Sequence, residues 1–428
     1  MLSVPADLSI EARWIVPMTV PGTVLENHTL VVRDGRIIEL LPTETAAARH
    51  APTATVRRST HLLMPGMINT ATHAARSLFR GMDSGSASLE QRFAGPEFVR
   101  DGVLAAIAEM LCSGITCFAD RYYFPDECAR AAALQGMRAI VGTPVAETPS
   151  LWAKSSGEYF TRALQVHDEY KGHPLISTAF APLAQGTLSD ATFARIATLA
   201  DELDARIVLD LHECAEEIDA CVARHGMRPI MRLWELGLLT PALHAVPMSL
   251  ASAEDIELAA RTGMSISLCP TSSLAACAGL PAVTELAASG IPLGLCSAHG
   301  TRQRNYDLWG EMKLSALASG AGVSASGAWN ALGMATRGGA AALGLDGEVG
   351  TLESGKWADL CCVDLSGPAT QPLRDPVTQL VFGGGRDIVS DVWVAGRQLL
   401  SEGEMTRLDW PDVADRAQAW AARLTIGV

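Results

Sequence analysis

The middle of this chain alternates short apolar runs with longer segments in which apolar residues recur at helical spacing. The runs are nearly continuous in apolar character and lie at 63–68, 115–119, 138–142, 175–181, 206–211, 242–246, 264–269 and 291–296. Strands that are covered on both faces have such sequences, because neither side of the strand contacts water. The pattern therefore predicts eight parallel strands separated by helices.

The segments between the runs carry signals of helix ends. Ser189 precedes apolar residues that include Phe193 and Ile196, and Ser252 precedes a similar pattern that stops at Gly263. Serine is a preferred N-cap, because its hydroxyl accepts a hydrogen bond from a backbone N–H that the helix leaves unsatisfied. Strand–helix units repeated in this way predict an α/β fold, a closed (β/α)8 TIM barrel. A doubly wound open sheet is the alternative, but no G-x-G-x-x-G sequence follows the first strand.

Both ends of the chain contain short strands around turns. Residues 12–16 and 29–38 predict strands, the second a hairpin with an Asp-Gly turn, and residues 358–364 and 392–397 predict strands near the C-terminus. The economical arrangement is one small β-sandwich, formed by the N- and C-terminal segments and packed beside the barrel. A surface helix is expected over 409–424.

These patterns divide the chain into three parts. We expect the N-terminal part of the β-sandwich at 1–62, the barrel at 63–355, and the C-terminal part of the sandwich with the terminal helix at 356–428.

Composition limits the classes of function. The 428 residues are 48% hydrophobic and 19% charged, which suits a large buried core. A net charge of −14 argues against nucleic-acid binding, which needs a basic surface. No secretory signal or apolar run of bilayer length is evident, and ten cysteines without a C-x-x-C pair indicate reduced thiols. We therefore expect a soluble cytoplasmic protein with a small-molecule substrate, and neither nucleic-acid nor membrane partners.

Six motifs follow one another in order along the chain. They are Met64-Pro65-Gly66-Met67-Ile68-Asn69-Thr70 and the segments 114–120, 212–214, 269–274, 307–312 and 350–360. In this order they resemble the amidohydrolase superfamily, and within it the methylthioadenosine/S-adenosylhomocysteine deaminase and chlorohydrolase branch. The resemblance covers nearly the whole length and implies the same barrel with its composite terminal domain.

The resemblance also implies four metal ligands, and the chain departs from the family's pattern at most of them. The H-x-H of the first strand falls on Ala71-x-His73, and the metal ligands of strands five, six and eight fall on Asp210, Pro247 and Ala298. A methyl group cannot bind a metal, and a catalytic zinc site needs three protein ligands. We therefore expect most metal ligands to be replaced and no metal or cofactor to be bound.

Four polar residues remain as candidate catalytic groups. Glu213 falls on the family's place for proton transfer, Asp210 lies at a strand end, His73 follows the first strand, and His299 lies beside Ala298. Either they form a metal-free acid–base set, or they have structural roles, with Asp210 paired to His73 or to an arginine. His299 completes a metal site only if its loop rearranges.

Further residues at the same end are candidates for substrate binding. Four arginines on strand-to-helix loops are solvated at the surface, pair with Asp120 and Asp307, or bind a carboxylate or phosphate of the substrate: Arg76, Arg121, Arg302 and Arg304. By resemblance Glu90 contacts a ribose, although its loop is shorter than in the family. His212, Cys296 and Ser297 complete the expected site, and Cys296 is either a nucleophile near His299 or a packed thiol.

Three functions follow from these observations. The leading hypothesis is a metal-independent enzyme that uses side-chain acid–base chemistry, by hydrolysis or by elimination or rearrangement, on a small nitrogen-containing substrate that can carry negative charge. The second is a catalytically inactive relative that binds a ligand or a partner subunit. The third is a conventional metal-dependent aminohydrolase. A homo-oligomer is expected in each case.

Overall fold

Eight parallel strands close into a barrel in the computed structural model, which describes residues 4–82, 86–183, 185–297 and 305–426. The strand order is β10-β11-β12-β5-β6-β7-β8-β9. Their bounds are β5 Met67–Thr72, β6 Ile115–Arg121, β7 Arg138–Val145, β8 Ile176–Pro182, β9 Arg206–Leu211, β10 Leu243–Pro247, β11 Ser265–Leu268 and β12 Leu293–Leu295. The predicted (β/α)8 barrel is confirmed.

The first barrel strand begins later than its apolar run predicts. Strand β4 (His50–Pro65) of the terminal sheet takes the first part of the run, and β5 begins at Met67. Gly66 separates them because a Cβ at this position would lie 2.1 Å from the side chain of Thr116. The run 63–68 is therefore shared between two sheets, and the chain passes from one to the other through a position where only glycine fits.

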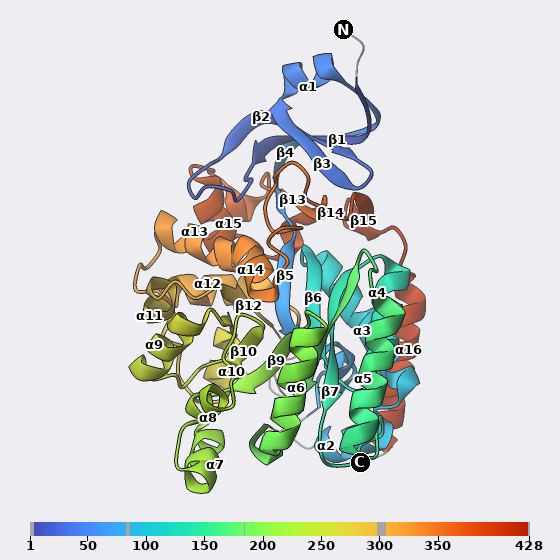
Figure 1. Cartoon of the computed structure of the whole chain (residues 1–428). Coiled ribbons are helices and arrows are strands. Elements are labelled where there is room, and N and C mark those ends of the chain that lie inside the picture. Colours follow the sequence, from blue (N-terminus) through green and yellow to red (C-terminus); the bar gives the residue numbers. More distant parts are fainter. Residues whose placement is uncertain (1–3, 83–85, 184, 298–304, 427–428) are drawn as a thin grey trace.

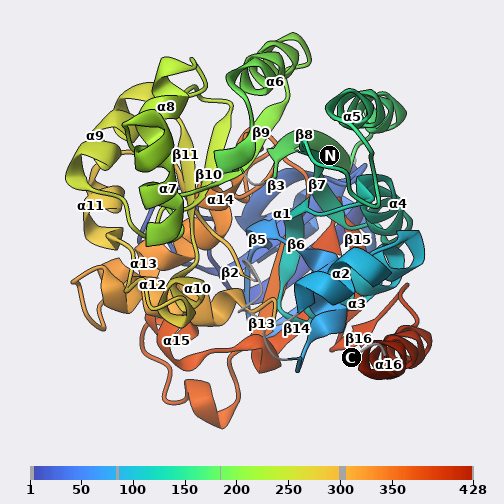
Figure 2. The same cartoon turned by 90° about the horizontal axis from the view of Figure 1, so that it is seen from below.

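Helices surround the barrel, as the view from below shows (Figure 2). They are α2 Ser86–Phe93, α3 Pro96–Cys112, α4 Pro125–Gln135, α5 Ser156–Tyr170, α6 Asp190–Glu202, α7 Ala215–His225, α8 Pro229–Glu235, α9 Ala253–Thr262, α10 Pro270–Ala275, α11 Val283–Ala288, α12 Leu308–Ala318, α13 Ala325–Gly333 and α14 Gly339–Leu343. The predicted caps are present: Ser189 accepts a hydrogen bond from the backbone of Thr192, and Ser252 forms a capping box with Asp255.

The two ends of the chain form one mixed sheet, at the top of Figure 1. Its order is β16-β15-β14-β13-β4-β1-β2-β3, and only β1 and β4 pair in parallel. The remaining bounds are β1 Val4–Ile15, β2 Leu25–Arg33, β3 Arg36–Pro42, β13 Leu360–Asp364, β14 Val389–Val394, β15 Arg397–Ser401 and β16 Glu404–Met405, with helices α1 Thr43–Arg49 and α15 Pro376–Gly383. The predicted composite of N- and C-terminal strands is confirmed.

A buried ion pair joins the barrel to this sheet. Arg138 at the start of β7 donates from Nε and Nη2 to the carboxylate of Asp359, at 2.7 and 3.0 Å. The backbone N–H of Ala395 donates to the same carboxylate at 2.8 Å. Because both charged side chains are almost fully buried, the pair is stable only while the two parts stay in contact.

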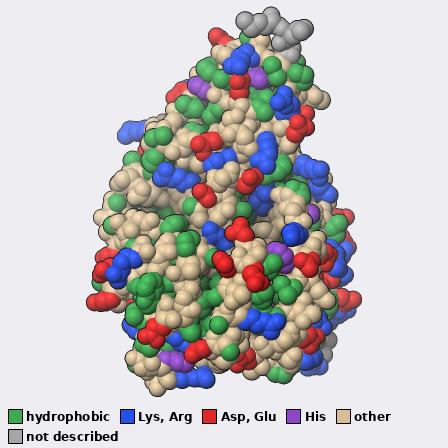
Figure 3. Space-filling model, in the orientation of Figure 1, with side chains coloured by type: hydrophobic (Ala, Val, Ile, Leu, Met, Phe, Trp, Pro, Cys, Tyr) green, Lys and Arg blue, Asp and Glu red, His purple; other side chains and the backbone are tan. Residues whose placement is uncertain are grey.

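The terminal helix α16 (Trp410–Ile426) returns from the sheet to the barrel. Trp420 lies against Phe98 of α3, with ring centroids 5.2 Å apart, and its indole N–H donates to Asp101 at 2.9 Å. The helix thus packs the C-terminal segment onto the barrel, and strand β4 crosses the expected boundary at residue 62, so the three-part division stays a prediction. Within the described part of the chain, no helix combines the length and apolar character needed to cross a membrane. On the face in Figure 3, basic and acidic side chains are interspersed.

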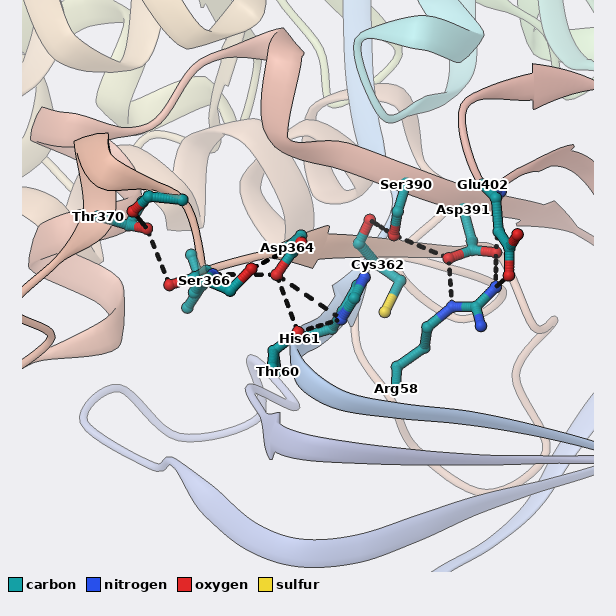
Figure 4. Close-up of polar contacts among 12 residues, drawn as sticks. Arg58, Thr60, His61, Cys362, Asp364, Ser366, Thr370, Ser390, Asp391 and Glu402 are labelled. Atoms are coloured by element: carbon teal, nitrogen blue, oxygen red, sulfur yellow. Dashed lines mark hydrogen bonds and ion pairs between the residues drawn. The ribbon is translucent and has the colours of Figure 1, made fainter.

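A second ion pair fastens the C-terminal strands to β4 (Figure 4). Arg58 donates from Nε and Nη2 to the carboxylate of Asp391, at 2.8 and 2.7 Å, and Ser390 Oγ donates to it at 2.7 Å. Burial raises the pKa of Asp391, but the hydrogen bonds and charge of Arg58 outweigh burial and hold this pKa below its usual value. The charged carboxylate therefore stabilises the sheet.

Replacing Asp391 by asparagine leaves Arg58 without its buried charge partner. We expect Asp391→Asn to lower the free energy of unfolding by about 3 kcal/mol in urea denaturation, because the guanidinium stays largely buried. Since the folded-state pKa is lowered, the wild type should lose this contribution as pH falls through that pKa, and the variant should not.

The exposed neighbour Glu402, 3.3 Å from Arg58, supplies the control. Glu402→Gln should change the free energy of unfolding by less than about 1 kcal/mol, because exposed ion pairs contribute little. Equal effects of the two substitutions would contradict the assignment of the stabilisation to the buried carboxylate.

Candidate active site

The interior of the barrel is filled by apolar and small side chains. They are Ile68, Ala71, Cys117, Ala119, Ile140, Ala179, Val208, Val246, Cys269 and Cys296, each at most 4% exposed. A filled barrel leaves only the strand ends for chemistry, and in TIM barrels the C-terminal ends carry the site. We call this end the barrel mouth; it lies on the side opposite the terminal sheet (Figures 1 and 2).

Four predicted site residues lie at the ends of β5, β6 and β9. His73 directly follows β5, Arg121 is the last residue of β6, Asp210 is the penultimate residue of β9, and Glu213 follows β9 by two residues. His299, Arg302 and Arg304 lie outside the described residues. The mouth thus combines one imidazole, one guanidinium and two carboxylates from three strands.

An ion pair crosses the mouth between strands that are not neighbours. Arg121 Nη2 lies 2.7 Å from Asp210 Oδ1, although β7 and β8 separate the two strands in the barrel. The Arg121 side chain is only 4% exposed, whereas that of Asp210 is 41% exposed. The sequence predicts that Asp210 either transfers protons or forms a structural ion pair. The structure contains the ion pair with an arginine.

Small residues make room for the Arg121 side chain. A Cβ at Gly142 of β7 would lie 2.9 Å from the backbone oxygen of Asp120, 3.0 Å from Ala181 Cβ and 3.2 Å from Arg121 Cγ. Such contacts are tighter than ordinary van der Waals packing, so a larger residue would displace the end of β6 together with the Arg121 side chain. Glycine at this position therefore lets the aliphatic part of Arg121 lie over β7.

The turn after β9 is held by a carboxylate from α7. Glu217 accepts hydrogen bonds from the backbone N–H groups of Glu213 at 2.9 Å and His212 at 3.1 Å. Burial raises the pKa of Glu217, although these two backbone hydrogen bonds act in the opposite direction. His212 has a φ of 53°, a conformation that non-glycine residues seldom adopt. The local hydrogen bonds thus fix the backbone from which Glu213 extends.

His212 itself lies in the wall of the barrel. Its ring is fully buried; Nε2 accepts from the backbone N–H of Ile230 at 3.4 Å, and Nδ1 lies 3.2 Å from Asp255. Burial opposes ionisation of Asp255, but His212 and Arg228 outweigh it and lower the pKa of this carboxyl strongly. The contacts of the His212 ring therefore join β9 to α8 and α9, and its predicted contact with substrate stays a prediction.

A second polar cluster lies beside β5. Arg76 donates from Nε and Nη2 to Glu90 at 2.8 and 3.0 Å, and the hydroxyl of Tyr122 donates to Glu90 at 2.5 Å. The ring of Tyr122 meets that of His73 edge-on, with centroids 6.3 Å apart. Arg76 and Glu90 thus neutralise each other. Tyr122 was not predicted, although its position directly after Arg121 at the end of a strand was a signal for it.

The predicted residues of strand eight have structural contacts. Cys296 is fully buried beside Cys269, whose pKa is raised by burial and by its hydrogen bond to Cys296. The backbone N–H of Ser297 donates to Asn69 at 3.0 Å, and the Asn69 amide donates to Ser297 Oγ at 2.7 Å. These bonds join the end of β12 to β5, and the roles of Cys296 and Ser297 toward substrate stay predictions.

The nearest histidine to Pro247 in the sequence, His244, is also part of the core. Its two ring nitrogens lie 2.8 Å from Ser265 Oγ and Ser267 Oγ. Burial lowers the pKa of His244 to about 3, so the ring is neutral. The described residues contain no group of three His, Cys, Asp or Glu side chains placed to hold a metal ion. The donors described at the mouth therefore do not fit a mononuclear metal centre.

The comparisons with known proteins place the chain in a family. The model of the amidohydrolase family matches residues 62–399. Two methylthioadenosine/S-adenosylhomocysteine deaminases, from Teredinibacter turnerae and Saccharophagus degradans, are each 37% identical to this chain. Each alignment covers 98% of this chain, and the two cover 98% and 97% of the respective relatives.

Solved structures agree with these relatives. An adenosine deaminase from Xanthomonas campestris with bound zinc is 38% identical, has a TM-score of 0.96, and matches over 99% of this chain and 100% of its own. The zinc complex of atrazine chlorohydrolase from Arthrobacter aurescens, 21% identical, has a TM-score of 0.89 over 97% of this chain and 100% of its own. The latter likeness supports the fold alone.

These comparisons contradict the leading hypothesis of a metal-independent enzyme. Relatives matched over nearly their full length are deaminases, and the similar deaminase structure contains zinc. They favour instead the third hypothesis, a metal-dependent aminohydrolase. The family match and the full-length identity give one conclusion: this chain belongs to the amidohydrolase family, as an enzyme close to the methylthioadenosine/S-adenosylhomocysteine deaminases.

Proposed function

We propose that this enzyme is an aminohydrolase that acts on an adenosine-like nucleoside, with methylthioadenosine and S-adenosylhomocysteine as the first candidates. The observation that carries the proposal is the similarity to deaminases of this substrate class, 37% identical over 98% of the chain. The net reaction replaces the exocyclic amino group of the purine by oxygen, consuming one water and releasing one ammonia.

The relatives and the site residues of this chain point to different conclusions about metal binding. The relatives favour metal dependence, and a bound cation in such enzymes lowers the pKa of a water ligand. We propose that several ligand positions implied by the resemblance hold other residues here, namely Ala71, Asp210 and Pro247. Since the described donors do not fit a metal centre, the roles that follow belong to the chain's own side chains.

Glu213 is the proposed proton carrier. Its backbone is fixed by Glu217, so its position beyond β9 is defined. A carboxylate at this place can take a proton from the attacking water and deliver it to the purine or to the departing amine. Asp210, His73 and His299 are proposed to orient the reacting groups.

Glu90 is the proposed contact for the ribose. Arg76 and Tyr122 already fill three of the about four acceptor sites of its ionised carboxylate, so it can still accept about one hydrogen bond from a ribose hydroxyl. Arg76 and Tyr122 are then positioning residues. Contacts of substrate with the arginines Arg121, Arg302 and Arg304 are part of the proposal. Contacts with the fully buried His212, Cys296 and Ser297, and assembly into a homo-oligomer, stay predictions.

Replacing Glu213 by glutamine tests the reaction. Ammonia release from methylthioadenosine, S-adenosylhomocysteine and adenosine should be detectable in the wild type, measured with and without added zinc. In Glu213→Gln we expect kcat to fall by about 100-fold or more, because the amide cannot transfer the proton. Nucleoside binding, measured by calorimetry, should persist.

The control is Asp219→Asn, at an exposed position on α7, which should leave kcat unchanged. Failure of the wild type to release ammonia from any of the three nucleosides, with or without zinc, would overturn the proposed function.

Replacing Glu90 by glutamine tests the ribose contact. Glu90→Gln should raise KM by about tenfold with a smaller change in kcat, because the contact is made in both the ground state and the transition state. The increase should shrink for a dideoxyribose substrate that lacks the 2′ and 3′ hydroxyls. The exposed Glu97 on α3 provides the matched control, Glu97→Gln. An equal increase of KM for the ribose and the dideoxyribose substrates would show that Glu90 does not contact the 2′ and 3′ hydroxyls.

A further inference from the structure

The Arg121–Asp210 pair has a consequence for the metal chemistry of the mouth. The carboxylate at the end of β9 is held by a guanidinium 2.7 Å away. We infer that Arg121 and a divalent metal ion compete for Asp210, and that in this chain the guanidinium holds the carboxylate, so that Asp210 does not ligate a metal while the pair is intact.

The burial of the arginine is the first support. The Arg121 side chain is 4% exposed, so moving it away from Asp210 would leave a buried cation without this partner. Separating a buried guanidinium from its charge partner is unfavourable, although the 41% exposure of the Asp210 side chain reduces the cost. A metal that used Asp210 would have to overcome this cost, and its affinity would fall accordingly.

The surroundings of the arginine are the second support. Arg121 ends β6 and reaches across the mouth to β9, with its aliphatic part over Gly142. A Cβ at Gly142 would lie 3.2 Å from Arg121 Cγ, so the absence of a side chain there accommodates the aliphatic part of the arginine. The path of Arg121 across the mouth is therefore set by the packing over β7.

The donor set around the pair is the third support. Among the residues that the structure describes, no three His, Cys, Asp or Glu side chains are grouped to hold a metal ion while Arg121 pairs with Asp210. The guanidinium, by contrast, gives the mouth a fixed positive charge with or without a bound metal. The competition therefore favours Arg121.

Zinc binding to the full-length protein tests the inference without reference to activity. Protein stripped with a chelator and dialysed is titrated with zinc by calorimetry, and its metal content is measured after gel filtration. Arg121→Met keeps the volume and removes the charge, so it should raise zinc affinity by at least tenfold. The gain should disappear in the double variant Arg121→Met with Asp210→Ala.

The variant Asp210→Ala alone keeps the test decisive if Arg121→Met does not fold. In the wild-type background it should leave zinc affinity unchanged, because Asp210 is not a ligand there. Arg261→Met, at an exposed arginine of α9, is the matched control and should have no effect. A tenfold loss of zinc affinity in Asp210→Ala, or equal affinities in the wild type and a folded Arg121→Met, would overturn the inference. Neither result depends on the nucleoside that the enzyme deaminates.

Discussion

The structure depends on the closure of eight parallel strands around a filled interior. Because each strand is covered by its neighbours, by helices and by the side chains inside, polar groups along its length would lack hydrogen-bond partners. Charged side chains are therefore confined to strand ends. This constraint places Arg121, Asp210 and Glu213 at the mouth, and it places the ion pair of Arg138 with Asp359 at the opposite end, where the terminal sheet covers the barrel.

The ion pairs at the two ends of the barrel differ in how far their carboxylates are exposed. At the sheet end, Arg138–Asp359 and Arg58–Asp391 fasten strands that are far apart in the sequence, and each carboxylate accepts additional hydrogen bonds. At the mouth, the Arg121–Asp210 pair leaves one partner 41% exposed. An ion pair with an exposed carboxylate can respond to a ligand, whereas a fully buried one only holds its elements together.

Family membership identifies the fold of this chain, whereas the side chains in the site determine which ligands it binds. Identity of 37–38% over nearly the whole chain reflects the many positions that build the barrel and its terminal sheet. Metal binding depends on a few donors, and substitution at a few positions changes it while leaving the fold intact. The relatives therefore define the family and the fold, and the residues at the strand ends decide what the mouth of this chain can bind.

The sequence by itself determined the eight strand–helix units, the helix caps at Ser189 and Ser252 and the presence of strands near both ends, because each depends on local periodicity and capping. It also located the mouth residues, since strand ends can be read from the apolar runs. It did not determine that Arg121 reaches Asp210, that Glu90 binds Arg76 and Tyr122, or that His212 points into the wall. Those contacts depend on the closure of the barrel and on the space at Gly142, which bring together side chains from separate strands and loops, and only the tertiary structure specifies them.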